Sequence, residues 1–330
     1  MIHIVQLQKG TERRVALVEE PRLRLLEQVE TVFALAHRAA ADGGPLAELV
    51  ARHATGEYVD YDAVYAGQSP WRLLAPVTHP DAACCLVSGT GLTHLGSAKS
   101  RQAMHTAGDN ETDSMRMFRW GMEGGKPPAG RAGTAPEWFY KGCGTILRAP
   151  GEPLERPAFA EDGGEEGEIA GVYLIDPDGV PRRLGLAIGN EFSDHVFEKK
   201  NYLNLAGSKL RTCSLGPELV LDPAFDSVPG CVTIERAGRR VWSQEIVTGE
   251  AEMCHSLANI EHHHFKFAAH RRPGDLHVHY LGACSLSFGA GVRLEDGDIM
   301  QVAFAGFGRP LRNPLRVEPG PAGFITTKPL

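Results

Sequence analysis

The chain has 330 residues, of which 42% are hydrophobic and 23% are charged, and its formal net charge is −7. These values are ordinary for a globular protein with a substantial core. The acidic balance and the lack of a basic stripe argue against a nucleic-acid-binding surface. The longest apolar stretches fall far short of a membrane span, so we expect neither nucleic acid nor membrane as a partner.

The N-terminus and the cysteines predict the cellular compartment. No apolar segment follows a basic start at residues 1–9, so we expect no signal peptide and a cytoplasmic location. The chain has seven cysteines and no CxxC pair. This odd set indicates buried, reduced thiols rather than a disulfide framework or a zinc ribbon.

The sequence changes character near Pro80. Before it, residues 22–41 place apolar side chains at helical spacing, and residues 45–53 predict a second, short helix. After it, glycine and proline punctuate short strand-like runs at residues 84–87, 172–175, 231–235, 276–280 and 299–304. We therefore predict an α+β, β-rich protein, with a small α+β N-terminal domain at residues 1–79 and a β-rich catalytic domain at residues 80–330.

Residues 102–133 differ from the rest of this second domain. They contain four methionines, an acidic run at 109–113 and a glycine- and proline-rich end. Long connections inside compact domains are often lids over active sites. A lid and a structured insertion without a catalytic part are both compatible with this composition.

Three acidic residues provide the strongest chemical signal. Residues 169–175 have the composition of a strand ended by the turn 176–179, and alternation along it points Glu166 and Glu168 to one face. A second strand at 184–188 would deliver Glu191 nearby. Carboxylate oxygens suit Mg²⁺, with Mn²⁺ or Ca²⁺ as alternatives. The competing interpretation is a solvated acidic loop.

A family resemblance rests on a series of motifs in register. Their order along the chain is Trp138-Phe139-Tyr140-Lys141, Glu166-Gly167-Glu168, Gly189-Asn190-Glu191-Phe192-Ser193, Lys209, Leu215-Gly216-Pro217, Pro273-Gly274-Asp275 and Asp296-Gly297-Asp298. Over roughly residues 80–315 this series resembles the fumarylacetoacetate hydrolase superfamily. The opening segment and the histidine-rich residues 261–265 resemble its sugar-acid, arabinonate-type branch.

The resemblance implies a mixed β-sandwich roll for the catalytic domain and assigns roles by position. It implies Glu166, Glu168 and Glu191 as metal ligands, although the superfamily usually has aspartate at the last position. It implies Lys209 and Lys141 as active-site lysines, serving as base or oxyanion donor. The candidates for contact with a 2-keto acid substrate are Thr93, Ser193, Gly282 and Ser285.

One departure from the superfamily bears on the reaction. Its C–C hydrolases carry a histidine and a glutamate that activate water. In the aligned stretch at residues 93–100, neither residue stands at the corresponding position. The resemblance therefore favours a metal-dependent dehydratase that converts a 2-keto-3-deoxypentonate to 2,5-dioxopentanoate in pentose catabolism, with His94 and Glu111 as candidates for protonating the departing hydroxyl. A diketo-acid hydrolase that releases pyruvate and a non-catalytic sugar-acid-binding protein are the alternatives. The resemblance also implies that the protein forms a homodimer or a higher homo-oligomer.

Overall fold

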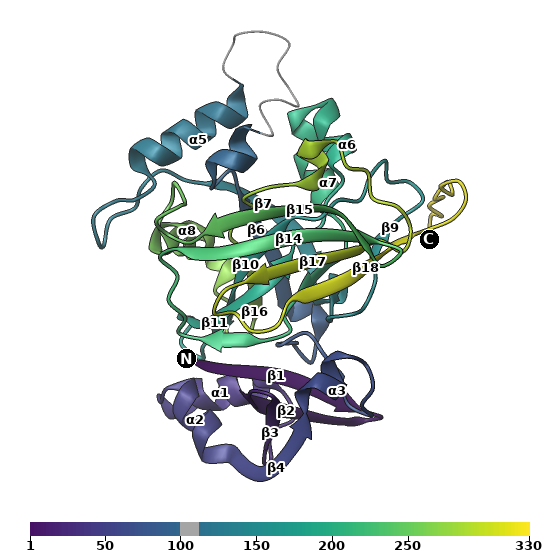
Figure 1. Cartoon of the computed structure of the whole chain (residues 1–330). Helices are drawn as coiled ribbons and strands as arrows, with labels where there is room; N and C mark the ends of the chain where they lie inside the picture. Colours follow the sequence, from purple (N-terminus) through teal and green to yellow (C-terminus); the bar gives the residue numbers. More distant parts are fainter. Residues whose placement is uncertain (100–111) are drawn as a thin grey trace.

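The computed structural model describes residues 1–99 and 112–330. Within them, thirteen strands form one large sheet (Figure 1). Ten strands follow one another in space: β4 (Ala54–Asp60), β3 (Arg22–Leu26), β2 (Glu12–Glu19), β1 (Ile2–Lys9), β13 (Leu219–Leu221), β11 (Pro181–Asn190), β10 (Gly167–Ile175), β16 (Leu276–Tyr280), β6 (Cys85–Gly91) and β7 (Glu137–Cys143). Off this path lie β5 (Arg72–Leu73), β8 (Leu147–Arg148) and β12 (Cys213–Leu215).

A second sheet of five strands packs against the large one. Its order is β15 (Arg239–Thr248), β14 (Val228–Arg236), β17 (Ile299–Phe304), β18 (Leu311–Val317) and β9 (Leu154–Arg156). Ile169 and Ile188 of the large sheet share one buried apolar cluster with Val232 and Val302 of the small sheet. The predicted β-rich, α+β fold is thus confirmed, with two sheets burying a common core.

Helices pack around the two sheets (Figure 1). Their bounds are α1 (Val32–Asp42), α2 (Leu46–His53), α3 (Tyr61–Tyr65), α5 (Asp113–Gly124), α6 (His195–Lys200), α7 (Leu205–Lys209) and α8 (Leu257–Phe265), with short 3-10 turns at Ala82–Cys84, Gly144–Ile146, Tyr202–Asn204, Ala268–His270 and Ser287–Ala290. The α1 helix packs on the large sheet, because its buried Leu35 belongs to the same cluster as Val172 of β10. Among the described residues, no helix is both long and apolar enough to cross a membrane.

The helix predicted over residues 22–41 is wrong in its first half. Arg22–Leu26 forms strand β3, in which the buried Leu23 and Leu25 flank the partly exposed Arg24, a spacing of two that fits a sheet. The helix begins only at Val32, after Thr31, whose side chain accepts a hydrogen bond from the Ala34 N–H. The second predicted helix is confirmed as α2.

The N-terminal strands extend the large sheet through the antiparallel pairing of β1 with β13, which joins Ile2 to Leu221 and Ile4 to Leu219. The division into two domains near residue 80 therefore stays a prediction, as does the lid. Residues 102–111 of the predicted lid, including Glu111, lie outside the described residues. Its later part forms α5, whose Phe118 packs in a buried cluster with Leu92.

Candidate metal centre

A β-hairpin brings the three predicted carboxylates together. Strands β10 and β11 pair antiparallel, with Gly167 opposite Asn190 and Glu168 opposite Gly189. Just beyond the paired residues, the Glu191 N–H donates to the Glu166 carbonyl at 2.9 Å. The Asn190 side chain accepts from the Glu166 N–H at 3.1 Å, which gives the motif asparagine a positioning function. One ligand atom each of Glu166, Glu168 and Glu191 lies within 4.8 Å of the others.

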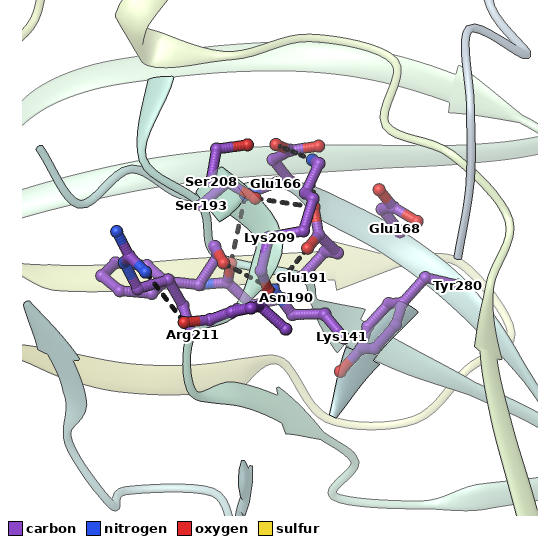
Figure 2. Close-up of polar contacts among 12 residues, drawn as sticks. Lys141, Glu166, Glu168, Asn190, Glu191, Ser193, Ser208, Lys209, Arg211 and Tyr280 are labelled. Carbon is purple, nitrogen blue, oxygen red and sulfur yellow. Dashed lines mark hydrogen bonds and ion pairs between the residues drawn. The ribbon is translucent and has the colours of Figure 1, made fainter. Parts of the chain in front are cut away.

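Two buried lysines reach this cluster from other elements (Figure 2). Lys209, at the end of α7, donates to Glu166 Oε1 and to Glu191 Oε2, at 2.5 Å each. Lys141, on β7, forms an ion pair with Glu191 Oε1 and donates to the carbonyls of Phe192 and Lys209, at 2.8 and 2.9 Å. Both oxygens of Glu191 are therefore held by lysine ammonium groups.

The three carboxylates differ in their electrostatic surroundings. Burial and the charges of Glu191 and Glu166 raise the pKa of Glu168 well above its ordinary value. Burial opposes charge on Glu166 too, but the Lys209 charge and hydrogen bonds from His195 and Lys209 hold its pKa well below the ordinary value. Burial and the Glu166 charge raise the pKa of Glu191. Burial and the neighbouring carboxylates thus oppose a negative charge on Glu168 in particular.

This donor set fits a hard divalent cation. All three side chains are buried, and their ligand atoms are carboxylate oxygens. Burial and repulsion from Glu191 and Glu166 raise the pKa of Glu168, and a cation at this point would offset both effects. Glu166, Glu168 and Glu191 are the residues that would hold Mg²⁺. The alternative of a solvated acidic loop is excluded for them, because none is more than 7% exposed.

The predicted substrate-contacting residues surround the cluster but make contacts within the protein. Ser193 Oγ donates to Glu191 Oε2 at 2.9 Å, and the Gly282 N–H donates to Glu168 Oε2 at 2.8 Å. Thr93 Oγ donates to the Leu281 carbonyl at 2.9 Å. Ser285 is half-buried in the loop that follows Gly282. Their roles toward a substrate stay predictions.

His94 lies next to Thr93 and is buried. Its Nδ1 is 2.9 Å from Thr93 Oγ1, and its Nε2 is 3.1 Å from Thr248 Oγ1. Burial lowers the pKa of His94 to about 4, so the imidazole is neutral near pH 7. A neutral histidine with both nitrogens hydrogen-bonded is poorly suited to protonating a departing hydroxyl, the role the sequence suggested.

Sequence reasoning missed His195, the first residue of α6. Its Nε2 lies 3.0 Å from Glu166 Oε1, and the side chain is buried. Burial opposes a charge on this imidazole, but the hydrogen bond and charge of Glu166 raise its pKa. The Asp194 side chain caps α6 by accepting from the Phe197 N–H at 2.9 Å. The sequence did contain one signal for this helix, because Asp194, a residue type that favours the N-cap position, directly follows the Asn190-to-Ser193 motif.

Two further acidic residues near the site were also missed. Glu165 is fully buried and accepts hydrogen bonds from the N–H and the hydroxyl of Ser287, both at 2.7 Å. Glu198 and His195 line a cavity of about 20 Å³ beside Glu166, which has room for about one water molecule. No spacing rule links residue 165 to residue 287, so the contact between Glu165 and Ser287 could not be predicted from the sequence.

Comparisons with solved structures identify proteins of the same fold. Comparisons with protein families and with curated proteins find no match. The apo form of a 2-keto-3-deoxy-D-arabinonate dehydratase superposes with a TM-score of 0.71 at 18% identity, covering 96% of this chain and 100% of that chain. A structure of that dehydratase complexed with magnesium and 2,5-dioxopentanoate gives a TM-score of 0.71 at 18% identity, over 96% of this chain and 99% of the other.

An isomerase shares the same architecture. The 5-carboxymethyl-2-hydroxymuconate delta-isomerase from Mycobacterium smegmatis matches with a TM-score of 0.59 at 18% identity, over 96% of this chain and 100% of that chain. The chain has the fold of the fumarylacetoacetate hydrolase superfamily, as the motif series predicted. Within that fold, it resembles the arabinonate dehydratase structures.

Proposed function

We propose that the protein is a metal-dependent dehydratase of a 2-keto-3-deoxy sugar acid, converting a 2-keto-3-deoxypentonate to 2,5-dioxopentanoate and water. The observation that carries the proposal is the buried triad of Glu166, Glu168 and Glu191 held by Lys209, in a fold shared with a dehydratase complexed with magnesium and 2,5-dioxopentanoate. The substrate is a small 2-keto acid, and the homo-oligomeric state stays a prediction.

The chemistry divides between the cation and the lysines. When bound by the three glutamates, Mg²⁺ would supply Lewis-acid stabilisation for negative charge that develops on the 2-oxo oxygen after a C3 proton leaves. Lys209 orients Glu166 and Glu191 through its two hydrogen bonds. Its ammonium group, with that of Lys141, adds positive charge beside the developing enolate. The proton released from C3 is balanced by the one that the C4 hydroxyl takes up to leave as water, which gives a C3–C4 double bond. Transfer of a proton from C5 to C3 and ketonisation of the resulting C4–C5 enol then give 2,5-dioxopentanoate.

The surroundings of His94 favour dehydration over C–C hydrolysis. The hydrolases of the superfamily activate water with a histidine and a glutamate, and this chain has Thr93-His94 in the corresponding region. His94 has its two nitrogens bonded to Thr93 and Thr248 and is buried. A water-activating base would need a nitrogen or carboxylate open to the substrate.

The test is product identification with the purified, chelator-treated protein. It is incubated with 2-keto-3-deoxypentonates of both configurations, with and without Mg²⁺, and the products are identified by mass spectrometry. Metal-dependent loss of one water from one configuration supports the dehydratase. An isomer of unchanged mass would indicate the isomerase reaction, cleavage of a diketo acid to pyruvate would indicate the hydrolase, and binding without turnover would indicate the sugar-acid-binding protein.

A further inference from the structure

A single peptide group connects the Thr93 segment to the candidate metal centre. The peptide between Leu281 and Gly282 accepts a hydrogen bond at its carbonyl from Thr93 Oγ1, at 2.9 Å. The N–H of the same peptide donates to Glu168 Oε2, at 2.8 Å. Because the carbonyl and the N–H of a trans peptide point in opposite directions, Thr93 and Glu168 hold this group from its two sides.

The chain of hydrogen bonds continues behind Thr93. Since the Thr93 hydroxyl donates to Leu281, it accepts from the Nδ1–H of His94 at 2.9 Å, which assigns the proton to Nδ1. Nε2 is then an acceptor and receives the hydroxyl proton of Thr248, at 3.1 Å. Four hydrogen bonds in one direction thus run from Thr248, at the end of β15, to Glu168.

We infer that Thr93 and His94 are positioning residues for the candidate metal centre, holding the Leu281–Gly282 peptide so that its N–H fixes and stabilises the Glu168 carboxylate. The inference rests on the proposed role of Glu168 as a cation ligand. Hydrogen bonds aligned in one direction polarise one another, so the terminal donor is stronger than an isolated amide. Partners of this kind around a ligand typically change metal affinity by about 10- to 100-fold.

Glycine at position 282 is required for this contact. Gly282 has a φ of +104°, which L side chains rarely adopt, and a Cβ there would lie 1.9 Å from Thr93 Oγ1. A side chain would therefore push the peptide and Thr93 apart. The residues that follow Thr93 also pack closely against the loop that follows Gly282, because a Cβ on Gly96 would lie 2.3 Å from the Cys284 carbonyl oxygen.

The need for this support follows from how the three ligands are held. Lys209 binds Glu166 and Glu191 directly. Glu168 instead receives its hydrogen bond from the Gly282 N–H, while burial and the neighbouring carboxylates oppose its charge. The peptide and the residues behind it therefore determine where the Glu168 oxygens lie.

The experiment measures Mg²⁺ affinity by calorimetry on the chelator-treated full chain. Thr93→Val keeps the side-chain shape but removes the hydroxyl, and we expect it to weaken Mg²⁺ binding by about 10- to 100-fold. Thr93→Ser restores the hydroxyl and should bind within about threefold of wild type. His94→Asn, which keeps a donor near the Nδ1 position, should bind more tightly than His94→Ala.

A stability control separates positioning from loss of fold. Leu35→Ala removes a fully buried side chain of α1, so it should lower the melting temperature while leaving Mg²⁺ affinity unchanged. If Thr93→Val binds Mg²⁺ as wild type does, the inference is overturned and the proposed function stands. If wild type itself binds no Mg²⁺, the proposed function fails and the inference fails with it.

Discussion

The backbone of Glu191 is tied directly to that of Glu166, since the Glu191 N–H donates to the Glu166 carbonyl at 2.9 Å. This bond closes the open end of the β10–β11 hairpin. The backbone alone therefore holds these two carboxylate-bearing residues side by side. A site built on paired strands is more precise than one built on free loops. It also explains why Glu166 and Glu191, far apart in the sequence, share the ammonium group of Lys209.

Shortening Glu191 tests whether its length matters. The Glu191 carboxylate meets Lys141 at Oε1 and Lys209 at Oε2, so Glu191→Asp would withdraw it from at least one lysine. A buried lysine left without its partner should lower the free energy of unfolding by about 3 kcal/mol and weaken Mg²⁺ binding. Urea unfolding and calorimetry measure the two effects. Unchanged stability and affinity would show that aspartate, usual in the superfamily, serves equally well here.

Neutralising Glu168 should have opposite effects on the metal-free and metal-bound protein. Its pKa is raised by burial and by neighbouring carboxylates, so the charged form opposes folding at any pH above the ordinary carboxyl range. Glu168→Gln should therefore raise the melting temperature of the chelator-treated protein. It should also abolish the increase in melting temperature that Mg²⁺ gives the wild type.

The exposed Glu245 on β15 offers the matched control for that experiment. Glu245→Gln removes the same charge far from the site, and we expect both melting temperatures to equal those of wild type. A Glu168→Gln protein that melts lower than wild type without metal would contradict the repulsion inferred among the three carboxylates.

Removing the Lys209 charge should destabilise the fold as well as the site. Lys209→Met leaves Glu166 and Glu191 buried without their shared cation, which should cost about 3–5 kcal/mol in unfolding free energy. Lys200→Met breaks a pair with Glu161 in which both side chains are substantially exposed, so its cost should stay below about 1 kcal/mol. Urea unfolding compares the two, and equal losses would argue against a structural ion pair at the site.

Much of the candidate site could be predicted from local sequence rules. Alternation along a strand placed Glu166 and Glu168 on one face, and the turn at residues 176–179 indicated a hairpin that returns to Glu191. The structure has this hairpin as β10 and β11. These signals work because they depend on residues close in sequence, where strand geometry leaves few options.

The contacts that tertiary packing creates could not be predicted in the same way. Thr93 donates to the carbonyl of Leu281 just beyond the neighbouring strands β6 and β16, and no local pattern relates positions so far apart in the sequence. The helix predicted through Arg22–Leu26 failed for a related reason. The apolar spacing there is compatible with a helix or a strand, and this segment forms a strand because it pairs with β2.

Acid should weaken the fold through buried histidines of the large sheet. Burial lowers the pKa of His277 to about 4 and that of His279 to about 3, below the value near 6.5 of an exposed histidine. At pH values between the folded and the exposed pKa of each histidine, the unfolded chain binds a proton that the folded chain does not. The free energy of unfolding should therefore be unaffected above about pH 6.5 and fall below it, by about 1.4 kcal/mol per pH unit for each histidine.

Urea unfolding of wild type and His277→Phe at about pH 7.5 and about pH 5.5 measures this effect. The variant should lose about 1 kcal/mol less than wild type between the two conditions. His262→Phe, on the exposed side of α8, serves as the control and should keep the wild-type difference. Equal pH dependence in wild type and His277→Phe would show that His277 is not held neutral.

Glu218 joins the N-terminal residues to the rest of the chain, and its substitution tests how independent those residues are. It is buried and accepts hydrogen bonds from Tyr61 Oη at 2.8 Å and the Arg309 N–H at 3.1 Å, and it lies 2.7 Å from His3 Nδ1. Arg309 also stacks over the Tyr61 ring at 3.8 Å.

Glu218→Ala should therefore loosen β1, β2 and β3 before it affects the candidate metal centre. We expect amide exchange in these strands to accelerate by about tenfold or more, equivalent to about 1.4 kcal/mol, with exchange in β10 and β11 unchanged. Such a result would support a separable N-terminal domain at residues 1–79. Equal acceleration in β10 would instead show one cooperative unit, as the continuous pairing of β1 with β13 would favour.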